Sequence, residues 1–242
     1  TVDCEIIYHE LKRENNFALT ESFLEELTED IDLVFLCSPS NPSGQVIEPE
    51  LMEQILTRCE EKKIRLVLDE CFIEFLEETQ KYTMVKKVTD HPSLFLVQAF
   101  TKMYGIPGLR LGYAMTSDAK LRESMQQIRQ PWSVSVPAQA AGIAAVKEIA
   151  FAEKSRALIA EQKAYLLEGL RKAGVKVFGF AANYIFFRAE AGLEKAMREA
   201  GFLIRDCGNF DGLTEGYYRI AVRGREENEK FLNTLNRVLG KM

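Results

Sequence analysis

A lysine lies directly after one of the apolar stretches of the chain. Lys102 follows residues 93–99, whose mostly apolar run predicts a buried strand, and Thr101 comes just before it. A lysine amine that is partly desolvated loses charge and becomes a nucleophile. Arg110 follows past a glycine-containing turn, and its permanent charge suits an anion. These residues predict a reactive amine beside an anion site, although a lone lysine at a strand end more commonly lies at the surface.

Two other polar residues also follow apolar runs. Asp69 comes after residues 64–68, and Asn41 lies in the turn-rich loop that follows residues 31–37. A carboxylate can pair with a protonated ring nitrogen, and an amide can donate to a ring oxygen without titrating. Taken singly, Asp-Glu is more often a helix cap or a solvated pair, and Asn-Pro-Ser-Gly a turn. Their position after predicted strands is what favours a ligand site.

The elements that position these residues alternate along the chain. A helix predicted at residues 51–62, led by a proline at position 49, separates the first two strands, and a brief strand is predicted at residues 111–115. In an open α/β sheet, strand ends, loops and helix N-termini converge at one edge, where ligands bind. We therefore expect the polar residues to meet at that edge.

The remaining segments predict two short N-terminal elements and a second domain. Residues 2–11 predict a strand, and residues 20–27 an acidic amphipathic helix. Residues 137–173 are rich in Ala, Glu, Lys and Leu, which predicts a long helix broken once near residues 149–150. The pattern of the C-terminal residues predicts an α+β unit. Its strands are expected at 175–178, 184–188, 202–206 and 217–223, and its helices at 193–200 and 226–239. Gly201 is expected to end the helix at 193–200.

Composition and charge exclude several classes of partner. The 242 residues are 47% hydrophobic and 28% charged, with 31 basic and 36 acidic residues and a formal net charge of −5. Because the basic residues are scattered, we expect no nucleic-acid partner. Because the sequence has no long apolar run and no signal segment, we expect no membrane location. Five cysteines without CxxC spacing predict free thiols in a reducing cytoplasm. For Cys71 and Cys207 a buried, unreactive role is favoured over a reactive one.

Together the motifs resemble one enzyme family. Residues 101–113, Thr-Lys-Met-Tyr-Gly-Ile-Pro-Gly-Leu-Arg-Leu-Gly-Tyr, are similar to the Schiff-base segment of pyridoxal-phosphate-dependent class I and II aminotransferases, which share the aspartate aminotransferase fold (fold type I). Residues 69–72, Asp-Glu-Cys-Phe, and 38–44, Ser-Pro-Ser-Asn-Pro-Ser-Gly, resemble two further motifs of that family. The resemblance implies an α/β fold: a three-layer large domain on a mostly parallel sheet, lacking its N-terminal part, and a small C-terminal α+β domain. We assign 1–136 to the incomplete cofactor-binding domain, 137–173 to an interdomain helical segment and 174–242 to the small domain.

The family's site residues carry over position by position. The resemblance implies that Lys102 binds pyridoxal 5′-phosphate covalently, while Thr101 and Arg110 bind its phosphate. It implies that Asp69 pairs with the ring nitrogen and that Asn41 donates to the ring oxygen. No metal is implied.

Other features point to one group within the family. Phe72 stands where most members have a tyrosine that hydrogen-bonds the cofactor, so that donor is missing. This change, with the segments at 129–134, 182–184, 203–207 and 218–223, resembles the L-threonine-O-3-phosphate decarboxylases. Histidinol-phosphate aminotransferases share the first three motifs but usually carry a glycine where Arg223 stands.

The arginines near the C-terminus have a physical rationale. A substrate with both a carboxylate and a phosphate needs at least two guanidinium groups, because each binds one oxyanion bidentately and keeps its charge. The resemblance implies that Arg219 binds the carboxylate and Arg205 the phosphate, and that Arg223 assists. Arg188 and Arg225 are more simply explained as covering the edge of the small domain.

The resemblance implies decarboxylation of a phosphorylated amino acid, L-threonine O-3-phosphate, to 1-amino-2-propanol O-phosphate, a cobalamin precursor, in a homodimer. Two alternatives stay open. One is an aminotransferase similar to the histidinol-phosphate enzymes, and the other is a non-catalytic fragment that serves only in association.

We expect residues 1–242 alone to bind pyridoxal phosphate weakly and to show little activity. The family's N-terminal arm, glycine-containing loop and cofactor-stacking aromatic have no counterpart in this sequence, and helix N-terminal amides supply much of the affinity for phosphate. Titration with pyridoxal phosphate, followed by visible absorbance, should give little covalently bound cofactor. A strong, stable absorbance band at stoichiometric cofactor would contradict this expectation.

Overall fold

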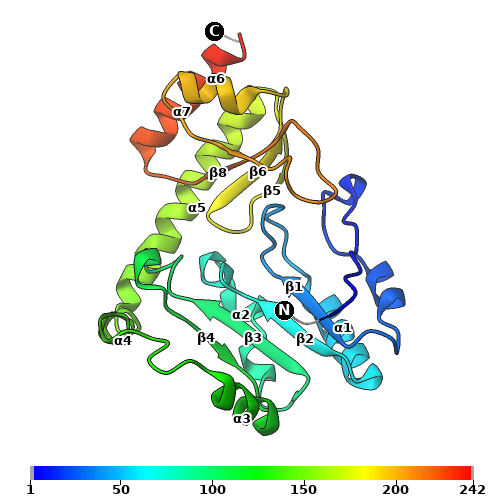
Figure 1. Ribbon diagram of the computed structural model, residues 1–242. Helices are drawn as coiled ribbons and strands as arrows, with labels where there is room; N and C mark the ends of the chain where they lie inside the picture. The colour runs from blue at the N-terminus through cyan, green and yellow to red at the C-terminus, as the bar shows by residue number, and fades with distance from the viewer. Residues whose placement is uncertain (1–2, 241–242) are drawn as a thin grey trace.

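Strands β1 (Leu33–Cys37), β2 (Arg65–Asp69), β3 (Leu94–Ala99) and β4 (Gly112–Met115) form the first sheet in that order. This is seen in a computed structural model that describes residues 3–240 (Figure 1). The first three strands are parallel and β4 is antiparallel to β3. The mostly parallel α/β sheet expected from the sequence is confirmed.

One face of this sheet is closely packed. Leu66, Leu68, Leu94 and Leu96 alternate along β2 and β3 and are fully buried, in one cluster with apolar residues of helix α1 (Pro49–Lys62). The opposite face is partly open, since Phe35 on β1 is 72% exposed. Because the side chains of a strand point alternately to the two faces, Asp69 projects to the face opposite Leu68.

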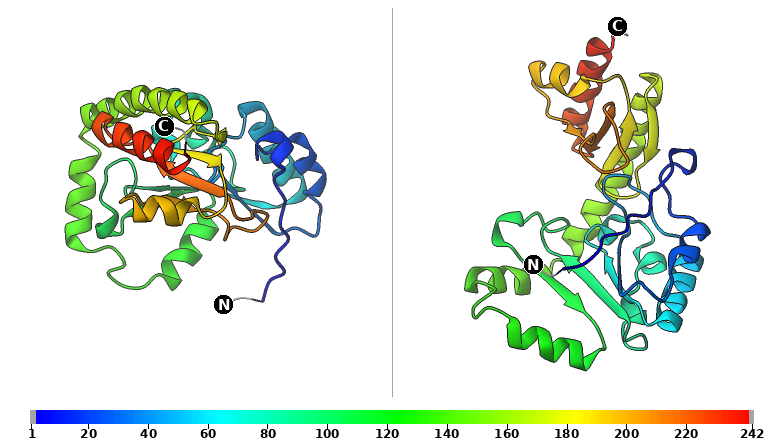
Figure 2. Two further views of the ribbon diagram at one scale, coloured as in Figure 1. Left: turned by 90° about the horizontal axis from the view of Figure 1, so that it is seen from above. Right: turned by 45° about the vertical axis from the view of Figure 1, so that its right-hand side comes forward.

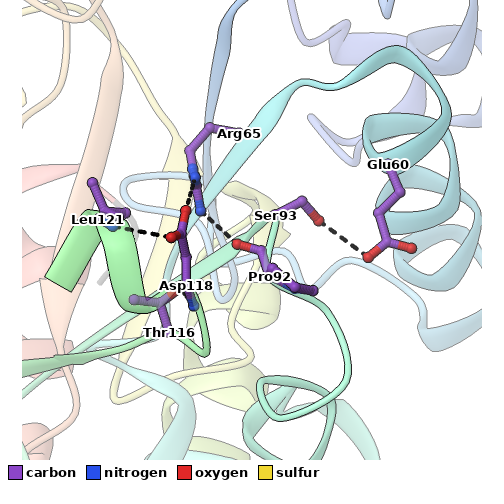
Figure 3. A network of polar contacts seen from close by, with 7 residues as sticks. All are labelled: Glu60, Arg65, Pro92, Ser93, Thr116, Asp118 and Leu121. Carbon is purple, nitrogen blue, oxygen red and sulfur yellow. Dashed lines mark hydrogen bonds and ion pairs between the residues drawn. The ribbon is translucent and has the colours of Figure 1, made fainter.

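A polar network fastens the start of β2 to the segment that follows β4 (Figure 3). Arg65 donates to the Pro92 carbonyl at 2.5 Å and to the Asp118 carboxylate at 2.6 Å. The other oxygen of Asp118 accepts from the Leu121 amide at 3.0 Å and so caps helix α3 (Ala119–Ile128). Helix α3 was not predicted from the sequence, although the capping aspartate is a recognisable signal. This network lies at the amino end of β2, whereas Asp69 ends the same strand.

Helix α5 (Ile149–Lys172) runs from the first unit to the second, as Figures 1 and 2 show. It follows α4 (Val136–Ala145), so the predicted single break in a long helix is confirmed, at residues 146–148. Within the described residues no helix combines the length and apolar character needed to cross a bilayer.

The second unit is the small α+β domain expected from the sequence. Its antiparallel sheet has the order β5-β6-β8-β7, from β5 (Lys176–Gly179), β6 (Tyr184–Arg188), β7 (Arg205–Asp206) and β8 (Tyr217–Ala221). Helices α6 (Leu193–Glu199) and α7 (Arg225–Val238) pack against it with α5, around Phe187, Tyr218 and Leu235. The short helices of the chain are η1 (Arg13–Asn15), η2 (Glu21–Glu26), η3 (Ile73–Phe75), α2 (Thr79–Tyr82), η4 (Val85–Lys87) and η5 (Pro107–Leu109).

Three local predictions are wrong. Val2 lies outside the described residues, and residues 3–11 form no strand, because no neighbouring strand pairs with them and Ile6 is 66% exposed. The helix predicted at 20–27 is a short 3₁₀ helix, and the Thr20 hydroxyl contacts Ser22 instead of capping it. Strand β7 is shorter than predicted, because Phe202 packs against Phe231 of α7 instead of continuing the ladder.

Truncating Leu96 to alanine should destabilise the first unit by about 3 kcal/mol, because a cavity would open in a fully buried cluster. The matched control is Leu203→Ala, since that side chain is 81% exposed and should cost little. Urea denaturation of both variants measures the difference. Equal unfolding midpoints for the two variants would contradict this packing.

Candidate active site

The candidate site lies at the carboxyl edge of the first sheet. Cys37 and Asp69 end β1 and β2 and face each other in register, and Asp69 pairs with Val97 of β3. Asn41 follows β1 in the next loop, and Lys102 follows β3. The parallel strands therefore bring these residues to one edge, as expected. One Asp69 oxygen accepts from the Cys71 amide at 2.8 Å, which fixes its carboxylate.

The Lys102 amine lies over an aromatic ring. Its Nζ is 5.2 Å from the ring centroid of Phe72, and the side chain is exposed. A ring face attracts an ammonium group without supplying a hydrogen-bond acceptor. The contact therefore places the amine beside the Asp69 segment while leaving its hydrogen-bonding capacity to a ligand.

Thr101 lies just after β3, and Arg110 lies just before β4, the strand that pairs with β3. Ala99 pairs with Gly112, and the Phe100 amide donates to the Leu111 carbonyl at 3.2 Å. Continuing this antiparallel register places Thr101 opposite Arg110. Arg110 has a left-handed φ of 52° and its guanidinium donates to the Pro107 carbonyl at 3.1 Å. Both residues expected at the cofactor phosphate thus come from one end of the β3–β4 pair.

Tyr184 joins the two domains at the site. Its hydroxyl donates to the Ser40 carbonyl at 2.6 Å, and its buried ring lies edge-on to Phe72 with centroids 5.1 Å apart. The Arg219 guanidinium lies 5.1 Å from the same ring centroid and donates to Asn41 Oδ1. Tyr184 was not predicted from the sequence to be a site residue. The available signal is a tyrosine on an apolar strand, whose hydroxyl needs a partner when buried.

Arg205 and Arg219 face each other on neighbouring strands. They form a register pair between β7 and β8, and Arg205 donates to the Asn209 side chain at 2.9 Å. Among the described residues neither guanidinium forms an ion pair with a carboxylate. Like charges directly opposite on a sheet are unfavourable, so the pair is suited to an anionic ligand.

Arg223 is placed differently. It lies past the end of β8, and its Nε is 3.9 Å from a Glu227 oxygen. No contact in the described part of the chain joins it to Arg205 or Arg219. The two arginines expected to cover the domain edge stack on tyrosines, Arg188 on Tyr217 and Arg225 on Tyr165.

Glu70 is a structural acid. Its buried carboxylate accepts from the Thr83 hydroxyl at 2.7 Å, the Met84 amide at 2.7 Å and the Gln98 amide at 2.9 Å. Burial raises the pKa of Glu70, while the three donors oppose that shift. This acid therefore holds β2, β3 and the following loop together on the face opposite Asp69.

The cysteines near the site are poor nucleophiles. Burial, with the neighbouring Asp69, raises the pKa of Cys71 to about 12. Burial likewise raises the pKa of Cys207 to about 11. Because the thiolate is the reactive form, both remain inert thiols near neutral pH, and all five cysteines are free.

Comparison with known proteins identifies the family. The family described as "Aminotransferase class I and II" matches residues 1–235. The chain belongs to this family. Threonine-phosphate decarboxylase of Salmonella typhimurium is 35% identical over 240 residues, which cover 98% of this chain and 65% of that protein. Histidinol-phosphate aminotransferase 2 of Archaeoglobus fulgidus is 32% identical over 208 residues, 85% of this chain and 58% of that protein.

The fold comparison agrees. The structure of histidinol-phosphate aminotransferase from Clostridium acetobutylicum superposes with a TM-score of 0.89 at 30% identity, over 94% of this chain and 70% of that one. The chain spans less than two thirds of the length of the two sequence relatives. The class I and II aminotransferase family, to which this chain belongs, consists of enzymes that depend on pyridoxal phosphate.

The residues at the sheet edge fit that cofactor. The amine of Lys102, the carboxylate of Asp69 and the amide of Asn41 supply the three functional groups that a pyridoxal ring requires, each from a different strand end. Phe72 adds an apolar surface among them. Thr101 and Arg110 could hold the phosphate, by a hydroxyl and a guanidinium.

Replacing Tyr184 by phenylalanine should cost about 1 kcal/mol of stability, because the Ser40 carbonyl would keep the Gly44 amide as a donor but lose the buried Tyr184 hydroxyl. Tyr165→Phe is the control, since its hydroxyl makes no hydrogen bond among the described residues. Thermal unfolding of the two variants measures the effect. If Tyr184→Phe is no less stable than the control, the hydroxyl does not hold the loop.

Proposed function

We propose that this chain carries the site of a pyridoxal-phosphate-dependent decarboxylase of L-threonine O-3-phosphate. The observation that supports it most directly is the opposed pair Arg205 and Arg219, two guanidinium groups on adjacent strands without carboxylate partners. A substrate with a carboxylate at one end and a phosphate at the other matches two such groups. The 35% identity to threonine-phosphate decarboxylase supports the same choice.

Each residue has a task in this proposal. Lys102 holds the cofactor covalently, Asp69 keeps its ring nitrogen protonated, and Asn41 donates to its ring oxygen. Thr101 and Arg110 bind its phosphate. When bound, pyridoxal phosphate supplies the electron sink for the bond that breaks at the substrate Cα.

The arginines determine the orientation of the substrate. Arg219, held over the Tyr184 ring and against Asn41, takes the carboxylate, and Arg205 takes the phosphate. Arg223 can join them only by breaking its ion pair with Glu227, which is weak because both side chains are exposed. Loss of the carboxylate as carbon dioxide and return of a proton to Cα, by the Lys102 amine, give 1-amino-2-propanol O-phosphate, a precursor for cobalamin.

The second candidate is an aminotransferase similar to the histidinol-phosphate enzymes. The TM-score of 0.89 with one such enzyme and the shared cofactor residues favour it. In that reaction Lys102 would take a proton from Cα, and no bond between Cα and another carbon would break. The same site chemistry thus serves both reactions, and the substrate arginines distinguish them.

Two wider features belong to the proposal. The enzyme acts in the cytoplasm as a homodimer, as the family resemblance implies. Trp132 and Ile128 are 95% and 83% exposed, and large apolar side chains of this kind gain free energy when an assembly covers them.

The reaction is tested in the full-length protein, with carboxyl-labelled L-threonine O-3-phosphate and saturating pyridoxal phosphate. We expect labelled carbon dioxide, and Lys102→Ala should lower the rate by at least about 100-fold, because the amine that holds and moves protons is lost. Lys154→Ala, an exposed lysine of α5, is the control and should leave the rate unchanged.

Other outcomes reject the proposal. If glutamate forms from 2-oxoglutarate and no carbon dioxide is released, the decarboxylase proposal is rejected in favour of the aminotransferase. If neither product forms and Lys102→Ala leaves the cofactor spectrum unchanged, the chain is a non-catalytic fragment.

A further inference from the structure

Two backbone segments meet at the junction of the domains with no side chain between them. A Cβ atom added at Gly179 would lie 1.9 Å from the Ser43 carbonyl oxygen, and one added at Gly44 would lie 2.9 Å from the Gly179 carbonyl carbon. Gly44 also has a φ of +66°, which side-chain-bearing residues rarely adopt. We call residues 40–45 the Asn41 loop and residues 178–182 the Gly179 turn. Their contact requires glycine on both sides.

Hydrogen bonds reinforce this contact. The Ala181 amide donates to the Gly44 carbonyl at 2.9 Å. The Gln45 side-chain amide donates to the Phe178 carbonyl at 2.7 Å and to the Asn16 carbonyl at 2.9 Å. One side chain thus ties the Asn41 loop to the Gly179 turn and to the N-terminal segment.

The Asn41 loop is closed on itself. The Ser40 amide donates to the Gln45 carbonyl and the Gly44 amide to the Ser40 carbonyl, both at 2.7 Å. A loop with such short internal bonds moves as a unit. A displacement of the Gly179 turn would therefore be transmitted to Asn41.

The Gly179 turn also leads into the strand beside Arg219. Tyr184 begins β6 just after the turn, and Phe186 of β6 is in register with Arg219 of β8. The Asn41–Arg219 hydrogen bond therefore spans two segments whose relative position depends on the glycine contact.

We propose that Gly179 and Gln45 are positioning residues that set the distance between Asn41 and Arg219, and with it how a substrate carboxylate is presented to the cofactor ring. This rests on the proposed function only in the roles of Asn41 and Arg219. Neither residue touches the cofactor in this proposal, and both act through the Asn41 loop.

The test replaces Gly179 by alanine, with Gly224→Ala as the matched control. A Cβ at Gly224 would meet nothing within 4 Å, and its φ of −65° suits alanine. In the cofactor-free protein, hydrogen exchange of the Ala181 amide should become at least about tenfold faster in Gly179→Ala, corresponding to about 1.4 kcal/mol. Amides within β2 should exchange as before in both variants.

A spectroscopic readout separates positioning from simple destabilisation. In the full-length protein with saturating pyridoxal phosphate, the pH midpoint of the bound cofactor's visible absorbance should move by at least about half a unit in Gly179→Ala, because a charged group near the ring has shifted. Gly224→Ala should keep the original midpoint. A lower melting temperature with an unchanged midpoint would overturn the proposal.

Gln45→Glu is the second variant, in case Gly179→Ala does not fold. Above pH 6 its carboxylate has no proton to donate to either carbonyl, so the same faster exchange and the same shifted midpoint are expected. Unchanged Ala181 exchange in a folded variant would overturn the proposal. Absence of any bound-cofactor absorbance in the unmodified full-length protein would instead contradict the proposed function, and the Ala181 exchange would still decide the positioning role.

Discussion

The parallel register of β1, β2 and β3 is the constraint on which the candidate site depends. Parallel strands end at the same edge, and the ladder aligns Cys37, Asp69 and Val97 across it. Leucines buried on one face of β2 and β3 hold that register, because a slip of one residue would expose them all. Polar residues that follow the strands therefore meet at this edge of the sheet.

Attachment of the small domain is the second determinant. The Asn41 loop is joined to β6 through the Tyr184 hydroxyl, to the Gly179 turn through backbone contact, and to β8 through Arg219. These are short polar contacts between segments far apart in the chain, so they specify one arrangement more sharply than apolar packing would. The loop that carries Asn41, for which we propose a role in cofactor binding, is thus positioned by both domains.

Electrostatics at the junction favour anionic ligands. Within residues 3–240, Arg205 and Arg219 face each other without carboxylate partners, while the nearby thiols of Cys71 and Cys207 stay protonated because burial raises the pKa of each. Lys102 lies over the Phe72 ring, and its amine has no hydrogen-bond acceptor in the described part of the chain. Two guanidinium groups and an amine therefore lie close to aromatic rings and to uncharged thiols.

The sequence by itself determined the elements whose signals are local. Continuous apolar runs before Asp69 and Lys102 predicted β2 and β3, and the proline before Leu51 marked the start of α1 correctly. The resemblance of three motifs to the aminotransferase family supplied the residues that we propose bind the cofactor. Only the tertiary structure decided that residues 3–11 form no strand, that Tyr184 joins the domains and that Gly44 touches Gly179. Each of these depends on a partner distant in the chain, and local patterns carry no information about which backbone will lie opposite.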